Sequence, residues 1–217
     1  MERLLLNCKS LDDLLGGGIE YGIITEIYGA AGTGKTNICL QASRECIMHG
    51  KKAAYIDTEG VSVERLQQIC KSNNYKKILS EILFFNPGSF EEQELAVVNA
   101  IKMKGLGLII IDTINMFYRM KLEDDEEGAE RSLIRQLTNL QLAARQKEIC
   151  VIITGQVYTA EDGDFKPFAG RGIEHMAKTI IKVEKMDIGK RRAVIIKHRS
   201  QPEGKKAVFA ITQNGLE

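Results

Sequence analysis

The chain has 217 residues, of which 44% are hydrophobic and 27% are charged, ordinary values for a globular protein with a buried core. The formal net charge is +1, whereas proteins that coat DNA typically carry a large excess of basic residues. This counts mildly against nucleic acid as the main partner. The five cysteines form no CxxC pair, a pattern that indicates reduced thiols. No signal peptide and no apolar run long enough to span a bilayer is present, so we expect a cytoplasmic protein without a membrane partner.

Strands and helices alternate along the chain. The predicted elements are strand 23–28, helix 34–49, strand 53–57, helix 62–72, strand 82–86, helix 89–103, strand 106–112, an acidic loop, helix 128–147 and strand 148–155. In the last third, segments 179–187, 191–199 and 205–211 are typical of strands joined by short turns. We therefore expect an α/β fold with a mostly parallel central sheet flanked by helices and extended by antiparallel strands at the C-terminal end. Residues 1–217 are expected to form a single domain.

Residues 29–36 read GAAGTGKT and match the phosphate-loop pattern G-x-x-x-x-G-K-[ST]. The match lies between a predicted strand and a predicted helix, which is the context that favours it over a chance glycine turn. The glycines let backbone N–H groups wrap phosphates, and the helix N-terminus adds a partial positive charge. Lys35 is expected to reach the β- and γ-phosphates, and the Thr36 hydroxyl to ligate Mg²⁺. The residues predicted to hold the nucleotide are Gly29, Ala30, Ala31, Gly32, Thr33, Gly34, Lys35 and Thr36.

Three other strand ends carry polar side chains suited to nucleotide chemistry. LIIID ends at Asp112, whose carboxylate suits a direct or outer-shell partner of Mg²⁺. IDTEG places Glu59 where a carboxylate could polarise a water against the γ-phosphate, although a solvated loop glutamate is the alternative. ITGQV ends a further strand, and Gln156 could sense the γ-phosphate and pass its presence into the following loop.

In order, CKSLDDLLGGGIEYGIITEIYGAAGTGKT, AAYIDTEGVSVERL, LIIIDT and VIITGQV resemble the core of the RecA-type recombinases, most closely their archaeal and eukaryotic strand-exchange branch. The likeness runs from about Cys8 to the C-terminus. It implies that ATP binds in the phosphate loop and that Thr36 and Asp112 hold the Mg²⁺. It also implies that Glu59 activates water and that Gln156 couples the γ-phosphate to a DNA-binding loop. Arg65 matches the arginine that packs on adenine in this family, with a solvated helix residue as the alternative.

Departures from the family pattern indicate a short archaeal paralogue that serves as an accessory factor. Seven residues precede Cys8, so we expect neither the N-terminal helix–hairpin–helix domain nor the linker phenylalanine that docks on the next subunit. Stable filaments are therefore not expected, and any homo-oligomer should be weak.

Two segments match the family's DNA-binding loops. The first contains an unbroken acidic run, 123–127, which repels phosphate and indicates a poor DNA clamp; a solvated lead-in to the next helix is the alternative. The second, 157–175, combines basic and aromatic residues suited to backbone contact and base stacking, although it also contains acidic residues. The residues predicted to contact DNA are Lys166, Phe168 and Arg171.

Lys197 and Arg199 lie two apart on a predicted strand and are expected to point the same way. In bacterial RecA and related ATPases, paired basic residues here reach across a subunit interface to the neighbour's γ-phosphate. We therefore hypothesise that Lys197 and Arg199 act in trans as cationic fingers. The alternative is an exposed basic edge that discourages strand aggregation.

Together these features predict an ATP-binding accessory protein of DNA repair and homologous recombination. It would bind DNA, modulate the main strand-exchange recombinase or a junction-processing nuclease, and hydrolyse ATP weakly. The alternative is a RecA-fold ATPase that acts on protein or signalling targets without DNA, which the near-neutral charge, the acidic run and the Lys-x-Arg pair favour. A small-molecule kinase is disfavoured, because 157–175 does not resemble an arginine-rich lid.

Overall fold

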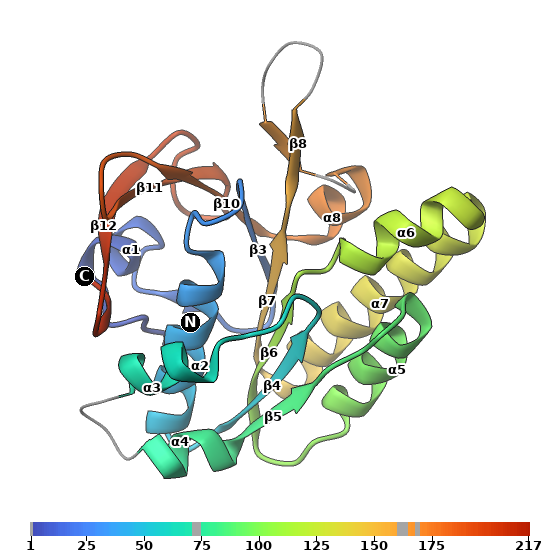
Figure 1. The fold of residues 1–217 in the computed structure, drawn as a ribbon, viewed down its shortest axis with the longest axis horizontal. Helices are drawn as coiled ribbons and strands as arrows, with labels where there is room; N and C mark the ends of the chain where they lie inside the picture. The colour runs from blue at the N-terminus through green and yellow to red at the C-terminus, as the bar shows by residue number, and fades with distance from the viewer. Residues whose placement is uncertain (1, 71–74, 160–164, 168–169) are drawn as a thin grey trace.

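The computed structural model describes residues 2–70, 75–159, 165–167 and 170–217 around a nine-stranded sheet (Figure 1). The six strands β10, β3, β7, β6, β4 and β5 run parallel, and β11, β12 and β13 extend the sheet antiparallel. The predicted parallel sheet with a C-terminal antiparallel extension is confirmed. In sheet order the strands are Gly215–Leu216 (β13), Lys206–Thr212 (β12), Lys190–Lys197 (β11), Thr179–Lys185 (β10), Ile24–Tyr28 (β3), Cys150–Gly155 (β7), Leu106–Asp112 (β6), Lys52–Asp57 (β4) and Ile82–Phe85 (β5).

Helices cover both faces of the sheet, and each face has its own buried apolar cluster. Alternate residues of a strand point to opposite faces, so on β3 Ile27 faces one cluster while Ile24 and Tyr28 face the other. The first face is covered by α1 (Lys9–Leu14), α2 (Lys35–Met48), α3 (Val63–Ile69) and α4 (Tyr75–Glu81). The second is covered by α5 (Phe90–Ile101), α6 (Met116–Asp124), α7 (Glu126–Lys147) and α8 (Gly170–Met176). Within the described chain, no helix is both long and apolar enough to cross a membrane.

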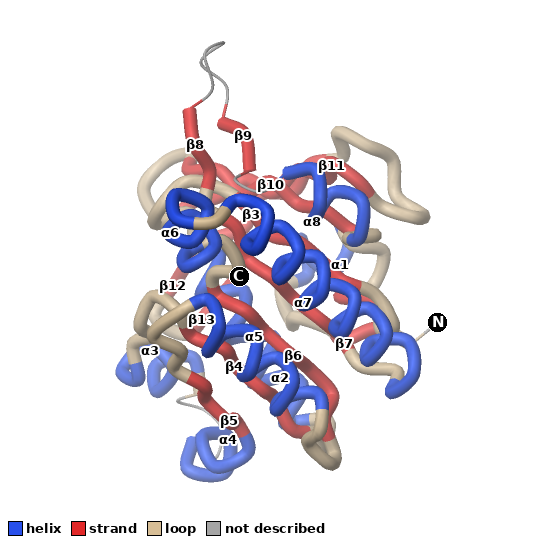
Figure 2. Tube along the Cα trace, turned by 90° about the vertical axis from the view of Figure 1, so that its right-hand side faces the viewer, coloured by secondary structure: helices blue, strands red, loops and turns tan. Residues whose placement is uncertain are grey.

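Two short antiparallel pairs lie outside the main sheet. The strands β1 (Arg3–Leu4) and β2 (Ile19–Glu20) pair near the N-terminus. The strands β8 (Val157–Thr159) and β9 (Phe165–Pro167) form a hairpin that extends beyond the body of the molecule, continuing the direction of β7 (Figure 2). The segment that follows the predicted γ-phosphate sensor therefore projects from the sheet edge.

The prediction of an acidic loop before the long second-face helix is wrong, because the segment is helical. Helix α6 ends at Asp124 and α7 begins at Glu126, with Asp125 between them. The Asp125 side chain caps α7 by accepting a hydrogen bond from the Gly128 N–H at 2.9 Å. Negative charge near a helix N-terminus is favourable, so the acidic run is explained by helix capping, the alternative that the sequence left open.

A buried glutamine on α2 ties both ends of the chain to the core. The Gln41 side-chain nitrogen donates to the Leu6 carbonyl at 2.6 Å, and its side-chain oxygen accepts from the Leu216 N–H at 2.8 Å. Gln41 is 1% exposed, so both backbone groups depend on it in place of water.

Replacement of Gln41 by alanine is expected to lower the free energy of unfolding by about 2–4 kcal/mol, because two buried backbone groups lose their partner. Urea unfolding followed by circular dichroism measures the change. The matched control is Gln67→Ala on the exposed face of α3, which should stay within about 0.5 kcal/mol of wild type. A loss at position 41 no larger than that at 67 would contradict the role of this glutamine.

Candidate nucleotide site

The predicted phosphate loop connects the carboxyl end of β3 to α2. Gly32 and Gly34 have φ angles of 71° and 101°, in the left-handed region that favours glycine. A Cβ added at Gly29 would lie 2.2 Å from the carbonyl oxygen of Val183 on β10. These three positions therefore need glycine for conformation or for space, as expected of a loop that presents backbone N–H groups to phosphate.

Lys35 begins α2, and its ammonium lies over the loop. Its Nζ donates to the carbonyl oxygens of Gly29 at 2.8 Å and Ala30 at 3.2 Å. The residue is 7% exposed, and burial lowers the pKa of Lys35, while the nearby Glu59 and Asp112 carboxylates act in the opposite direction. A buried cation beside a glycine loop and two carboxylates fits the phosphates and Mg²⁺ of a nucleotide.

Asp112 ends β6 and is 2% exposed. One carboxylate oxygen accepts from the Tyr55 hydroxyl at 2.7 Å, and the other accepts from the Thr154 hydroxyl. Each carboxylate oxygen can accept a second hydrogen bond, so Asp112 retains capacity to hold a water of Mg²⁺. Thr36, half-buried in the first turn of α2, offers the hydroxyl ligand. Within the described residues, no cluster of three or more His, Cys, Asp or Glu could hold a metal ion.

Glu59 and Gln156, 97 residues apart, meet at this edge of the sheet. Asp57 fixes the turn that carries Glu59 by accepting from three backbone N–H groups, those of Glu59, Gly60 and Val61, at 3.2, 2.8 and 2.7 Å. The Glu59 carboxylate then accepts from the Gln156 side-chain amide and from a threonine hydroxyl at 3.3 Å. The predicted water-activating group and the predicted γ-phosphate sensor are thus linked directly.

Two residues that the sequence reasoning missed hold Gln156 in place. Asn115 donates to the Gln156 carbonyl at 3.1 Å and accepts from the Gln156 N–H at 3.2 Å. Arg119, one turn further along α6, donates to the Gln156 side-chain oxygen at 3.5 Å. Their spacing of three and seven residues after Asp112 was a usable signal, because it places Asn115 at the N-cap and Arg119 in the first turn of the helix that follows this strand.

Arg65 lies beside α2 with its guanidinium held on several sides. It donates to the Asn37 side-chain oxygen at 2.5 Å, to the Gln68 side chain at 3.0 Å, and to the carbonyls of Thr212 and Gln213 at 2.8 and 3.3 Å. These bonds tie α3 to the turn between β12 and β13. A solvated helix residue, the alternative, does not describe this position, while contact with adenine stays a prediction.

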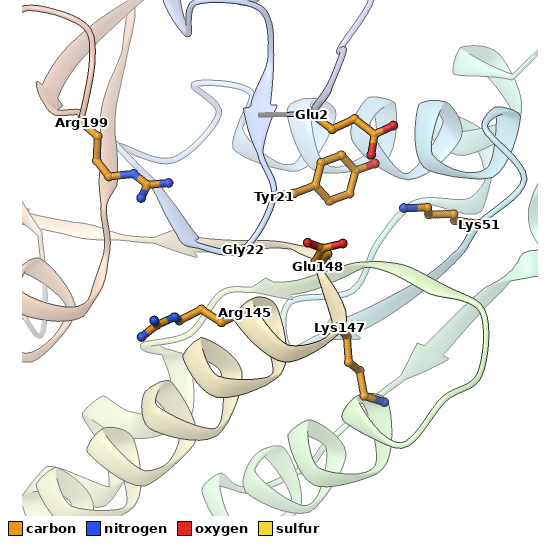
Figure 3. A pocket seen from close by; sticks show the side chains of 8 residues that line it. All are labelled: Glu2, Tyr21, Gly22, Lys51, Arg145, Lys147, Glu148 and Arg199. Carbon is orange, nitrogen blue, oxygen red and sulfur yellow. The ribbon is translucent and has the colours of Figure 1, made fainter.

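Lys197 and Arg199 lie at the opposite edge of the sheet from the phosphate loop. The expectation that both sit on one strand is wrong, because β11 ends at Lys197. Lys197 donates to the Glu174 carbonyl at 2.6 Å, whereas Arg199 forms an ion pair with Glu20 on β2. Figure 3 shows Arg199 at the rim of a cavity near the start of β3 and the end of α7. Neither cation contacts the phosphate loop of its own subunit in the described contacts, so a role in trans stays a prediction.

Two of the three predicted DNA-contact residues lie on the projecting hairpin or on the helix that follows it. Lys166 is in β9 and Arg171 is in the first turn of α8, while Phe168 lies outside the described residues. Lys166 therefore lies on the hairpin that begins directly after Gln156, and Arg171 lies on the helix that follows this hairpin in the chain.

The sequence reasoning also missed Glu26, a buried acid on the strand that leads into the phosphate loop. It is 2% exposed, and its Oε1 has no hydrogen-bond partner among the described residues. Burial, together with the Glu174 carboxylate on α8, raises the pKa of Glu26 to about 8, while Lys197 on β11 acts in the opposite direction. The carboxyl group is therefore protonated at neutral pH, and the observable signal in the sequence was only a charged residue within an apolar strand.

Folding raises the pKa of Glu26, so the folded state binds this proton more tightly and stability falls as pH rises from about 4.5 to about 8. The variant Glu26→Gln should lack this pH dependence. The difference in its free energy of unfolding between pH 5 and pH 8 should be smaller than in wild type by roughly 2–4 kcal/mol. Urea unfolding at a series of pH values measures it. The exposed control Glu123→Gln should keep the wild-type profile, and parallel curves for Glu26→Gln and wild type would refute the assignment.

Comparison with known proteins agrees with this geometry. A family model described as Rad51 matches residues 3–217. The DNA repair and recombination protein RadB of Methanococcoides burtonii is 47% identical over 220 residues, covering 99% of this chain and 97% of that protein. The protein of the same name from Archaeoglobus fulgidus is 38% identical over 225 residues, covering 100% of both. A crystal structure of the RadB recombinase is similar with a TM-score of 0.87 and 37% identity, over 99% of this chain and 98% of that chain. The resemblance to RecA-type recombinases is confirmed, and the chain belongs to the Rad51 family.

Proposed function

We propose that this protein is an ATP-binding accessory factor of DNA repair and homologous recombination. It binds ATP with Mg²⁺ in the phosphate loop, contacts DNA through the β8–β9 hairpin and modulates a strand-exchange recombinase or a junction nuclease. The family membership and the names of the relatives support the recombination role. The nucleotide-dependent part rests on the site itself.

The observation that carries the proposal is the hydrogen bond between Glu59 and Gln156. Glu59 belongs to the group of charges around Lys35, and Gln156 immediately precedes the hairpin. When a γ-phosphate binds beside Lys35, Gln156 can exchange its bond to Glu59 for one to the phosphate. That exchange alters the contacts of Gln156 with α6 and the position of the hairpin, which couples the nucleotide state to the DNA surface.

Slow hydrolysis follows from the placement of the cations. Phosphoryl transfer depends on positioning and on charge stabilisation at the γ-phosphate, and an absent cationic finger costs about 10³–10⁵ in rate. Lys197 and Arg199 are engaged at the other edge of the sheet. A single subunit therefore works as a nucleotide switch, with faster turnover requiring a cation from a neighbour.

Wild-type protein is expected to bind ATP clearly and to release phosphate at a rate close to background. The variant Glu59→Gln should abolish the remaining ATP turnover, because it lacks the carboxylate that polarises the attacking water. Phosphate release is measured with and without single-stranded DNA across protein concentrations. The control is Glu64→Gln, which removes one negative charge from an exposed position of α3 and should leave the turnover rate at the wild-type value. Strong DNA-stimulated turnover that disappears in Glu59→Gln would instead make the protein a DNA-dependent ATPase.

Binding to single-stranded DNA is expected to weaken steeply with salt, and Lys166→Ala should reduce the slope of log affinity against log salt by about 0.7, the contribution of one phosphate contact. Fluorescence anisotropy with a labelled oligonucleotide measures both. Lys104→Ala, in the exposed loop before β6, removes the same charge away from the hairpin and should leave the slope unchanged. An absence of binding at low salt would eliminate DNA as a partner and favour the alternative, a RecA-fold ATPase with protein targets.

A further inference from the structure

A cavity of about 390 Å³ lies between the phosphate loop and the β10–β11 hairpin. Gly29, Ala30 and Thr33 form the loop side, and the charged side chains of Lys182, Lys185 and Arg192 stand among those on the hairpin side. The hairpin lies here because β10 pairs in parallel with β3, with Lys182 opposite Tyr28, the last residue before the loop. These hairpin cations therefore share the sheet edge of the nucleotide site.

The tip of Lys185 rests against the middle of the phosphate loop. A Cβ added at Gly32 would lie 3.1 Å from the Lys185 Nζ and 3.3 Å from its Cε. Glycine at position 32 thus leaves room for this side chain as well as permitting the loop conformation. The contact comes from within the subunit and joins two segments about 150 residues apart in the sequence.

The charges of the hairpin are not balanced. Glu184 forms ion pairs with both Lys182, at 3.0 Å, and Arg192, at 2.6 Å. No hydrogen bond or ion pair engages the Lys185 ammonium within the part of the chain that the structure describes. One carboxylate is shared by two cations, and the Lys185 ammonium beside Gly32 forms no ion pair among the described residues.

Arg191 holds the loop from the same hairpin. One terminal nitrogen of its guanidinium donates to the Gly32 carbonyl at 3.2 Å, and the other donates to the Lys190 carbonyl at 2.9 Å. Its Nε is buried without a hydrogen-bond partner among the described residues. Arg191 therefore fixes the Gly32 peptide group, against which Lys185 lies. Its Nε–H remains a buried donor.

We propose that Lys185 binds the phosphate chain of the bound nucleotide in cis, with Arg191 positioning the loop at Gly32. The inference rests on the proposed ATP binding, and it adds a phosphate-binding residue that the phosphate-loop pattern does not contain. A nucleoside triphosphate carries several negative charges, and an unpaired ammonium against the loop, on the lining of this cavity, stabilises them through charge-assisted hydrogen bonds. Lys185 acts on affinity for the phosphates and leaves the need for a cation at the γ-phosphate unchanged.

The test compares Lys185→Ala with Lys190→Ala, which removes an exposed charge from the same hairpin outside the cavity. Binding of fluorescent ATP, ADP and adenosine analogues is measured at low salt with purified full-length protein. Lys185→Ala should bind ATP and ADP about 10-fold more weakly and adenosine equally well, Lys185→Arg should recover most of the affinity, and Lys190→Ala should match wild type. The dependence on the number of phosphates separates a phosphate contact from a general loss of structure.

A thermal readout independent of turnover accompanies this comparison. Without nucleotide, Lys185→Ala should unfold at the wild-type temperature, because its ammonium has no partner to lose. The increase in unfolding temperature on adding Mg-ATP should be smaller than in wild type. Equal ATP affinity in wild type and Lys185→Ala overturns this inference and leaves the proposed function intact, whereas a wild-type protein that binds no ATP overturns both.

Discussion

The buried ammonium of Lys35 is the interaction on which the site depends. A charge that is 7% exposed must be compensated within the protein, and its partners are the Gly29 and Ala30 carbonyls and the field of the Glu59 and Asp112 carboxylates. These groups follow or end three different strands, β3, β4 and β6, so no local segment can supply them. Only a sheet whose parallel strands end at one edge brings these groups together. Compensation of the Lys35 charge therefore requires the α/β topology.

The same edge explains why a nucleotide signal can leave the site. Gln156 lies between two sets of contacts: its side chain bonds to Glu59, and its backbone is clamped by Asn115. Arg119 adds a bond from α6 to the Gln156 side chain. A reorientation of the Gln156 side chain would break its bonds to Glu59 and to Arg119 on α6, because both partners bond to its side-chain amide. In the proposed switch, the phosphate and Glu59 compete for this amide, and the hairpin after Gln156 would carry the result outward.

The sequence predicted features that depend on short-range pattern and missed features that depend on distant partners. The phosphate loop, the apolar strands and the carboxylates at their ends follow from local spacing, and the structure places Lys35, Glu59, Asp112 and Gln156 around one edge. The acidic run before α7 was misread because its charge suggested a loop, whereas helix capping at Asp125 decides its conformation. Arg199 could not be placed from sequence, since its partner, Glu20, lies 179 residues away and on a different small sheet.

Two pairs of cationic residues, Lys185 with Arg191 and Lys197 with Arg199, lie toward opposite ends of the sheet, because β11 pairs antiparallel with β10. The end of β10 and the start of β11 lie beside the phosphate loop, whereas the end of β11 returns to the far edge, next to the start of β10. Under the proposals above, Lys185 and Arg191 serve the nucleotide of their own subunit, whereas Lys197 and Arg199 would serve a nucleotide presented by another molecule. If both proposals hold, ATP binding depends on the turn end of the β10–β11 hairpin, and turnover depends on the end of β11 and the loop after it. A protein that assembles weakly would then retain binding and lose most of its turnover.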